Sequence, residues 1–298
     1  MILIKTNDGK YTLLNCLELL GNKPKCYICR LKNSPLIFLL LASLVITSCS
    51  RYNRVMKSTD IELKYEYAIK YYTEENYNKA YPLMEEIIPL YRGTERSEEL
   101  NYKYAKCNYY LSDYILAGYL FQKFYNLFPT SEYAEEAMFT SAYCYYLNSP
   151  VFSLDQSNTN EAISEFNKFR NTYPASPLVD SAISITNELY AKLDKKAWEN
   201  ARLFYKTENY KASIVALQNF LRDHPNSAYE KEANFLILKS TYLLAMNSII
   251  KKKEDRINDT IDAYYNFVDN FGDEKYLKES EEMYDSILKE RDKLLKED

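Results

Sequence analysis

Glycine and proline are scarce in this chain, whose 298 residues include five glycines and nine prolines. Folds built from strands and tight turns need more of both, because glycine supplies the positive φ angles of many turns and proline presets others. The scarcity therefore disfavours an all-β or doubly wound α/β fold and favours a helical one.

The sequence also lacks the residues of the common catalytic and metal sites. His224 is the only histidine, so neither a histidine-based triad nor a multi-histidine metal site can form. Glycine-rich phosphate loops are absent, and the carboxylates show no recognisable catalytic pair. We therefore predict that the protein is not an enzyme and binds no cofactor or metal. His224 occupies a repeat position that elsewhere holds an aromatic ring, and we expect it to fill the same packing position.

No apolar run is long enough to cross a bilayer. Leu36 to Thr47, behind several cations, would rise only about 18 Å as a helix, against roughly 30 Å of hydrocarbon. This is the shape of a signal peptide. The run ends in Ile46-Thr47-Ser48-Cys49, which resembles a bacterial lipobox. We therefore predict a leader at residues 1–48, lipidation of Cys49 and a tether at 49–59, with more than one acyl chain holding the protein on a membrane.

The leader also bears on localisation. Residues 1–32 are long for the start of a signal peptide, which would fit a start codon assigned too early. An acidic run that could direct export to the cell surface does not follow Cys49, where Ser50 and Arg51 stand instead. We expect a lipid anchor on the periplasmic face of the outer membrane. Without residues 1–48 the formal charge becomes −8, which disfavours nucleic acid as a partner.

Tyrosine is abundant, with 31 residues, and a pattern that begins with it recurs five times. A small residue follows three positions on, and large apolar residues follow four, seven and eleven positions after that. The copies start at Tyr77, Tyr114, Thr159, Tyr210 and Ile257, and carry Ala80, Ala117, Ala162, Ser213 and Thr260 as the small residue. These spacings trace one helical stripe, and Pro or Gly after most copies ends the helix.

A preceding helix has its own register, with Ala68, Ala105, Ala142 and Ala201 at equivalent places. Small residues in both helices and a terminal proline are similar to the TPR pattern. We predict an all-α, TPR-like solenoid of about five helical hairpins over residues 60–298, closed by an amphipathic C-terminal helix. The large residue that stands four positions after each small one is Met84 in the first copy and Tyr264 in the last. From one copy to the next, these residues lie 37, 45, 51 and 47 positions apart. Lengthened helices or insertions such as 148–156 must therefore separate the hairpins.

Two cysteines, Cys107 and Cys144, remain outside the leader and the lipidation site. Each falls two residues after the alanine of its repeat. Equivalent points in neighbouring repeats lie too far apart for a disulfide, so we predict free thiols.

Aromatic rings stand three before and four after the alanine of each first helix. They are Tyr65, Tyr72, Tyr102, Tyr109, Phe139, Tyr146, Trp198 and Tyr205. A seven-residue spacing places them on one face, which in TPR arrays usually lines the binding groove. We predict that Tyr65, Tyr72, Tyr102, Tyr109, Phe139 and Tyr146 bind peptides, because rings offer area at little entropic cost. The alternative, that the rings pack between helices, remains open.

A lipobox cysteine followed by lengthened TPR-like hairpins resembles the BamD family, lipoproteins of the outer-membrane β-barrel assembly machinery. The stretch from Asp113-Tyr114 to Phe128-Pro129, the helix start Ala134-Glu135-Glu136-Ala137 and the segment Ser153-Leu154-Asp155-Gln156 resemble its Bacteroidetes-type members. The resemblance implies a scaffold that receives unfolded barrel substrates with residues 60–147. It also implies that residues 159–298 bind the periplasmic domains of a BamA-like partner. Another periplasmic TPR lipoprotein scaffold, for the cell envelope or for division, and a SusD-like nutrient-binding lipoprotein remain alternatives.

Overall fold

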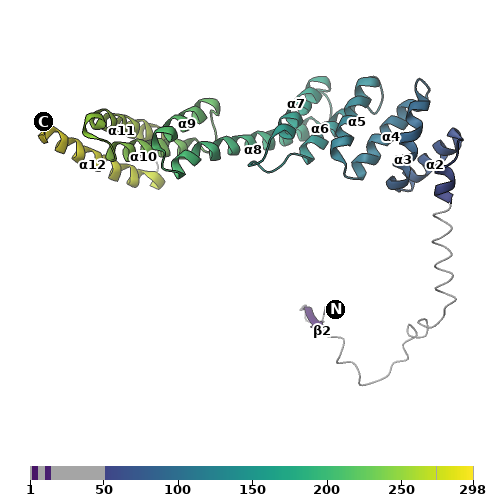
Figure 1. The fold of residues 1–298 in the computed structure, drawn as a ribbon, viewed down its shortest axis with the longest axis horizontal. Helices are drawn as coiled ribbons and strands as arrows, with labels where there is room; N and C mark the ends of the chain where they lie inside the picture. Colours follow the sequence, from purple (N-terminus) through teal and green to yellow (C-terminus); the bar gives the residue numbers. More distant parts are fainter. Residues whose placement is uncertain (1, 6–10, 15–50, 273, 298) are drawn as a thin grey trace, which may run out of the picture. The chain divides into compact units, whose positions relative to one another are not determined.

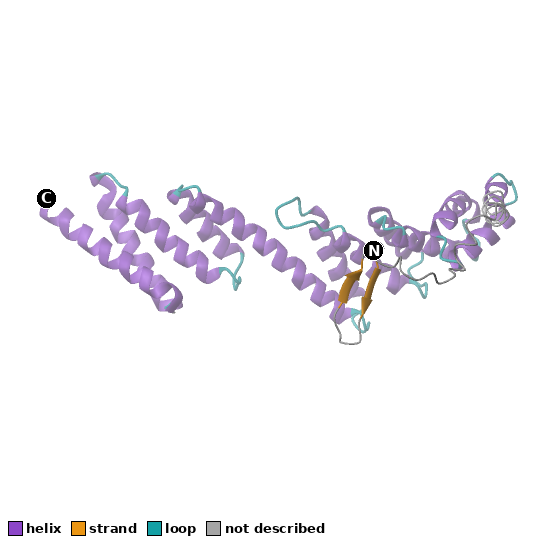
Figure 2. Cartoon of the chain, turned by 90° about the horizontal axis from the view of Figure 1, so that it is seen from below, coloured by secondary structure: helices purple, strands orange, loops and turns teal. Residues whose placement is uncertain are grey.

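The computed structural model describes residues 2–5, 11–14, 51–272 and 274–297, and side chains within 51–272 and 275–296. The chain divides into two compact units, residues 1–67 and 68–298. In the first unit β1 (Ile2–Lys5) pairs antiparallel with β2 (Tyr11–Leu14), Ile2 lying opposite Leu14 (strands in Figure 2). The sequence did not predict this hairpin. Cys49 and its lipobox lie outside the described residues.

All the regular secondary structure in the described part of the second unit is helical. The helices are the end of α2 (Ile61–Thr73), α3 (Tyr77–Ile87), the 3-10 helix η2 (Ile88–Tyr91), α4 (Arg96–Tyr110), α5 (Tyr114–Leu127), α6 (Ala134–Leu147), α7 (Ser157–Thr172), α8 (Val179–Lys206), α9 (Tyr210–Asp223), α10 (Glu230–Met246), α11 (Ile250–Phe271) and α12 (Glu274–Glu297) (Figure 1). The pairs α2/α3, α4/α5, α6/α7, α8/α9 and α10/α11 are the five predicted hairpins, and α12 closes the array. The predicted all-α TPR-like solenoid is confirmed.

The hairpins pack through the predicted stripe. Its five small residues, Ala80, Ala117, Ala162, Ser213 and Thr260, are all 0 % exposed. Large side chains one turn further on, such as Phe121 and Phe166, are equally buried. Close approach is tightest at Gly118 of α5, where an added Cβ would lie 3.2 Å from Cβ of Cys144 in α6. The second helices α5, α7, α9 and α11 each contact the first helix of their own hairpin and the helix that follows them, and α3 contacts α4.

Lengthened helices account for the irregular spacing of the repeats. α8 has 28 residues, and its first half packs against α7 while its second half packs against α9. α11 has 22 residues and includes the lysines 251–253 at its start. The insertion at 148–156 is a loop held against α8, where Lys192 Nζ lies 2.8 Å from Ser149 Oγ and Lys195 Nζ lies 4.6 Å from the ring centroid of Phe152. Among the described residues, no helix combines the length and apolar character needed to span a membrane.

Three hairpin turns share one backbone conformation. Glu75, Ser112 and Glu208 each stand two residues before the second helix, with φ of 56°, 63° and 61°. The next N–H in each turn donates to the carbonyl five residues back, as from Asp113 to Asn108 at 3.0 Å. This is the left-handed helix ending that usually uses glycine. In the second turn Asp113 Oδ1 also caps α5 by accepting from Leu116 N at 3.2 Å.

We therefore expect Ser112→Gly and Glu208→Gly to stabilise the protein. Holding a residue with a Cβ in the left-handed region costs about 1–2 kcal/mol. Glycine avoids this strain, but it loses about 0.5–1 kcal/mol more in conformational entropy when the chain folds. Urea unfolding should show a net gain of about 0.5–1 kcal/mol for each change. Tyr109→Gly, within the last turn of α4, should destabilise, and a loss of stability in the two turn variants would contradict this interpretation.

The two cysteines of the array are free and buried, as predicted. Cys107 Sγ lies 3.9 Å from Met84 Sδ, and Cys144 lies beneath Gly118. Burial raises the pKa of each thiol to about 12. The thiolate, which is the reactive form, is therefore almost absent from the folded protein at neutral pH.

We expect neither thiol to react with an aromatic disulfide reagent at about pH 8 while the array is folded. A chain of residues 51–298 contains only these two cysteines, so concentrated guanidinium should release two equivalents of reacting thiol. Fast reaction of both thiols in the native state would show that the helices open far more readily than their packing indicates.

Candidate peptide-binding site

The predicted aromatic residues divide into two groups. Of the rings three positions before each alanine, Tyr102 and Trp198 are buried inside the hairpins, whereas Phe139 is half-buried. Tyr102 is 6 % exposed and stacks on Tyr133 at 4.4 Å between ring centroids. Phe139 contacts Phe166 at 5.6 Å and Phe169 at 5.4 Å. Tyr102 and Trp198 therefore present little surface to a partner.

The rings four positions after each alanine are half-buried and stand nearer the surface. Tyr72 meets Tyr77 edge to face at 5.7 Å, and Tyr109 meets Tyr114 in the same way at 5.7 Å. The hydroxyl of Tyr146 donates to Glu188 Oε2 at 3.0 Å. Tyr65 is half-buried in α2. Parts of Tyr72, Tyr109 and Tyr146 therefore remain accessible.

The sequence did not indicate Tyr110, an exposed ring that directly follows Tyr109. Tyr110 is 46 % exposed and stacks on Tyr77 at 4.5 Å. Lys106 Nζ lies 5.6 Å from the Tyr110 ring centroid, and Lys103 Nζ lies 5.3 Å from that of Tyr72. The i, i+4 spacing of Lys106 and Tyr110 could have indicated one shared helix face. We call the surface formed by Tyr72, Lys103, Lys106, Tyr109 and Tyr110 the tyrosine–lysine face.

Carboxylates hold the two lysines of this face in place. Lys106 Nζ pairs with Glu136 Oε1 of α6 at 2.6 Å, and Lys103 pairs with Glu99 one turn earlier in α4. Burial opposes ionisation of Glu136, but hydrogen bonds from Lys106 and Tyr102 outweigh it and lower the pKa of that carboxyl. Burial raises the pKa of Tyr72, with smaller contributions from Tyr110 and other neighbours. The Tyr72 phenol therefore stays neutral at physiological pH and can donate a hydrogen bond.

The tyrosine–lysine face combines apolar ring surface, phenol hydroxyls and fixed cations. Rings lose little rotamer freedom on binding, and hydroxyls can pair with a peptide backbone. Lysine over a ring attracts aromatic or acidic side chains of a partner. The arrangement is suited to unfolded polypeptide and contains no reactive pair.

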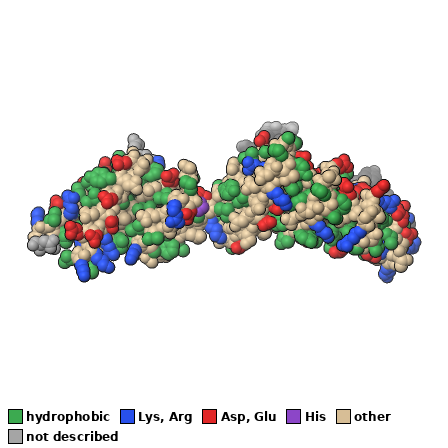
Figure 3. All heavy atoms as spheres, turned by 90° about the horizontal axis from the view of Figure 1, so that it is seen from above, with side chains coloured by type: hydrophobic (Ala, Val, Ile, Leu, Met, Phe, Trp, Pro, Cys, Tyr) green, Lys and Arg blue, Asp and Glu red, His purple; other side chains and the backbone are tan. Residues whose placement is uncertain are grey.

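Elsewhere the described surface mixes both signs of charge, as the face in Figure 3 shows. Within the described residues, His, Cys, Asp and Glu form no group of three that could hold a metal ion. His224 stacks on Phe220 at 5.1 Å, and its Nδ1 lies 3.2 Å from Asp194 Oδ1. It fills the aromatic position predicted for it and also links α9 to α8.

Comparison with known proteins gives one family match. Residues 57–202 match the family YfiO, described as "Outer membrane lipoprotein". The TPR domain of P58(IPK), a crystal structure, aligns over 84 % of this chain and 69 % of its own, at 13 % identity and a TM-score of 0.35. No curated protein matches the sequence. The match to a family of outer membrane lipoproteins agrees with the prediction that the chain is not an enzyme.

We expect substitutions of Tyr102 and Tyr110 to separate packing from surface. Tyr102→Ala removes a buried ring and should cost about 3 kcal/mol or more in chemical denaturation. Tyr110→Ala removes a half-exposed ring and should cost no more than about 1 kcal/mol. Equal losses for the two variants would place Tyr110 in the core and end its candidacy as a binding residue.

Proposed function

We propose, from the match of residues 57–202 to a family of outer membrane lipoproteins, that this chain is a scaffold of the outer-membrane β-barrel assembly machinery. Cys49 carries the lipid that anchors it to the periplasmic face of the outer membrane. The hairpins then hold two kinds of protein: unfolded barrel substrates and a BamA-like partner with periplasmic domains. The family match is the observation that carries the proposal.

The N-terminal hairpins, within residues 60–147, receive substrates in this proposal. Strands of β-barrels that face lipid are rich in aromatic and apolar side chains, and before folding they present them together with unpaired backbone groups. The rings of the tyrosine–lysine face can contact these side chains, and its phenol hydroxyls can form hydrogen bonds with the unpaired backbone groups. Of the six predicted peptide-binding residues, Tyr72, Tyr109, Phe139 and Tyr146 are half-buried and have accessible surface for this role, while the buried Tyr102 supports it from beneath.

The C-terminal hairpins, within residues 159–298, bind the partner in this proposal. The family match ends at residue 202, so most of this half lies outside it. That observation favours one alternative, a periplasmic TPR lipoprotein scaffold with a different partner. Both functions share the anchor and the array, and the copurifying protein distinguishes them.

Affinity purification of the full-length lipidated chain from solubilised outer membranes tests the proposal. We expect a large β-barrel protein with periplasmic domains to copurify, identified by mass spectrometry. Cys49→Ser should move the chain out of the membrane fraction, because it removes the acylated side chain. Repeated absence of such a barrel protein, with other envelope proteins recovered instead, would replace the proposal with the alternative.

The substrate role needs a matched pair of variants. Tyr109→Ala with Tyr110→Ala should weaken binding of a urea-unfolded outer-membrane barrel protein roughly tenfold, the loss of one good contact. Tyr119→Ala removes a tyrosine of α5 that is 55 % exposed and lies outside the tyrosine–lysine face, so it should leave binding unchanged. The same loss in both variants would exclude a specific role for the face.

A further inference from the structure

Equivalent grooves recur on the side of the array formed by the second helices. Each is enclosed by a second helix, the following first helix and the next second helix. One such groove lies among α5, α6 and α7, and another among α9, α10 and α11. Because the repeats share a register, residues at matching positions can be compared directly between them.

The groove among α5, α6 and α7 is filled by the chain itself. Tyr125 donates from its hydroxyl to Glu165 Oε2 at 2.7 Å and accepts from Lys168 Nζ at 3.0 Å. Gln122 Nε2 lies 3.4 Å from Glu165 Oε1. Glu165 is only 5 % exposed, and Tyr145 adds a further half-buried ring. These side chains contact one another across the groove.

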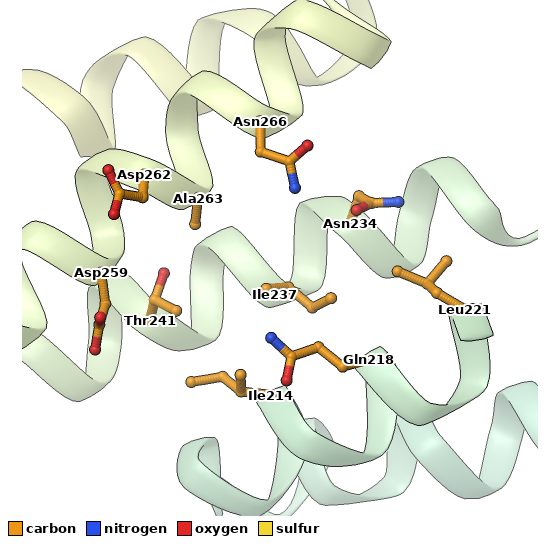
Figure 4. A pocket seen from close by; sticks show the side chains of 10 residues that line it. All are labelled: Ile214, Gln218, Leu221, Asn234, Ile237, Thr241, Asp259, Asp262, Ala263 and Asn266. Atoms are coloured by element: carbon orange, nitrogen blue, oxygen red, sulfur yellow. The ribbon is translucent and has the colours of Figure 1, made fainter.

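At the matching positions the groove among α9, α10 and α11 has smaller side chains. Leu221 replaces Tyr125, Ala263 replaces Glu165, and Thr241 replaces Tyr145. The positions correspond because the two residues of each pair stand equally far from the start of the pattern in their repeats. For the first pair, Tyr125 is eleven residues after Tyr114 and Leu221 is eleven residues after Tyr210. A cavity of about 600 Å³ remains, lined also by Ile214 and Ile237 (Figure 4).

The lining of this cavity is apolar at its floor and polar on its walls. Ile237 of α10 forms the floor, while the carboxamides of Gln218 from α9 and Asn266 from α11 point toward it from opposite walls (Figure 4). Asn266 Oδ1 accepts from Asn270 Nδ2 at 2.9 Å, so its own N–H groups remain for the groove. Asp259 and Asp262 stand at one end. Among the described side chains, no cation pairs with either carboxylate.

We propose that this groove binds a polypeptide segment of a partner in which a lysine or arginine is flanked by apolar residues. The apolar neighbours lie over Ile214 and Ile237, the carboxamides of Gln218 and Asn266 pair with the segment's backbone, and the cation lies against Asp259 and Asp262. The complementary charge of the two carboxylates selects a basic segment over an acidic one.

The volume and the lining agree on a polypeptide. About 600 Å³ is typical of a site that buries several side chains, and carboxamides are suited to the alternating donors and acceptors of a backbone. This proposal rests on the proposed function, in which the protein works by binding other proteins. It names a different surface, however, because none of its residues belongs to the tyrosine–lysine face.

Fluorescence anisotropy with the full chain and a labelled acetyl-Leu-Arg-Leu-Arg-Leu-amide tests the groove. We expect saturable binding that weakens with added salt, and far weaker binding of the Leu-Glu-Leu-Glu-Leu counterpart. Asp259→Asn with Asp262→Asn should weaken binding of the basic peptide about tenfold. Asp180→Asn with Asp285→Asn removes the same charge elsewhere and should leave the affinity unchanged, which controls for attraction to the acidic protein as a whole.

A second variant fills the groove by copying its neighbour. Leu221→Tyr, Ala263→Glu and Asn266→Lys recreate the Tyr125–Glu165–Lys168 contacts beside the existing Gln218. This variant should retain its helical circular dichroism and lose peptide binding. Equal affinity for the two peptides, or binding that the aspartate pair does not change, would overturn the proposal even if the filled variant failed to fold. Continued copurification of the barrel partner in that event would leave the proposed function standing.

Discussion

Close approach of helices at five small side chains is the constraint on which the structure depends. Ala80, Ala117, Ala162, Ser213 and Thr260 are fully buried, and a larger residue at any of them would push the second helix away from the helices that it packs against. The large rings one turn away can fill the core only at that separation. Left-handed turns at Glu75, Ser112 and Glu208 then reverse the chain within a few residues, so that these three hairpins share one turn geometry.

Repetition of this geometry gives the array two kinds of surface that vary without disturbing the core. On the first helices, residues beside the alanine face outward, and in α4 they are Lys103, Lys106 and Tyr110. On the side of the second helices, the size of a few side chains decides whether a groove is filled or open. Tyr125 and Glu165 fill one groove, whereas Leu221 and Ala263 leave another empty. Binding surfaces can therefore differ between repeats at little cost in stability.

The sequence predicted the array well because its signals are local and periodic. These signals are the alanines at equivalent places, the five-residue stripe and the prolines that end helices, and each depends only on residues close by in the chain. The structure confirms the five hairpins and the closing helix. The binding surface was harder to predict. Tyr102 and Tyr109 occupy the same helix stripe, yet Tyr102 is buried because Tyr133, the residue just before α6, stacks on it. The open C-terminal groove depends on comparing Leu221 and Ala263 with residues of another repeat, which requires knowing which helices enclose it.

Site-specific photocrosslinking in intact cells tests the central claim most directly, that the packed array presents the tyrosine–lysine face to unfolded barrel proteins. A photoreactive phenylalanine analogue at position 110 is compared with the same analogue at position 115, where Ile115 is exposed on α5. The account predicts that unfolded outer-membrane barrel proteins crosslink at position 110 and not at position 115. Crosslinks at both positions, or at position 115 alone, would contradict it.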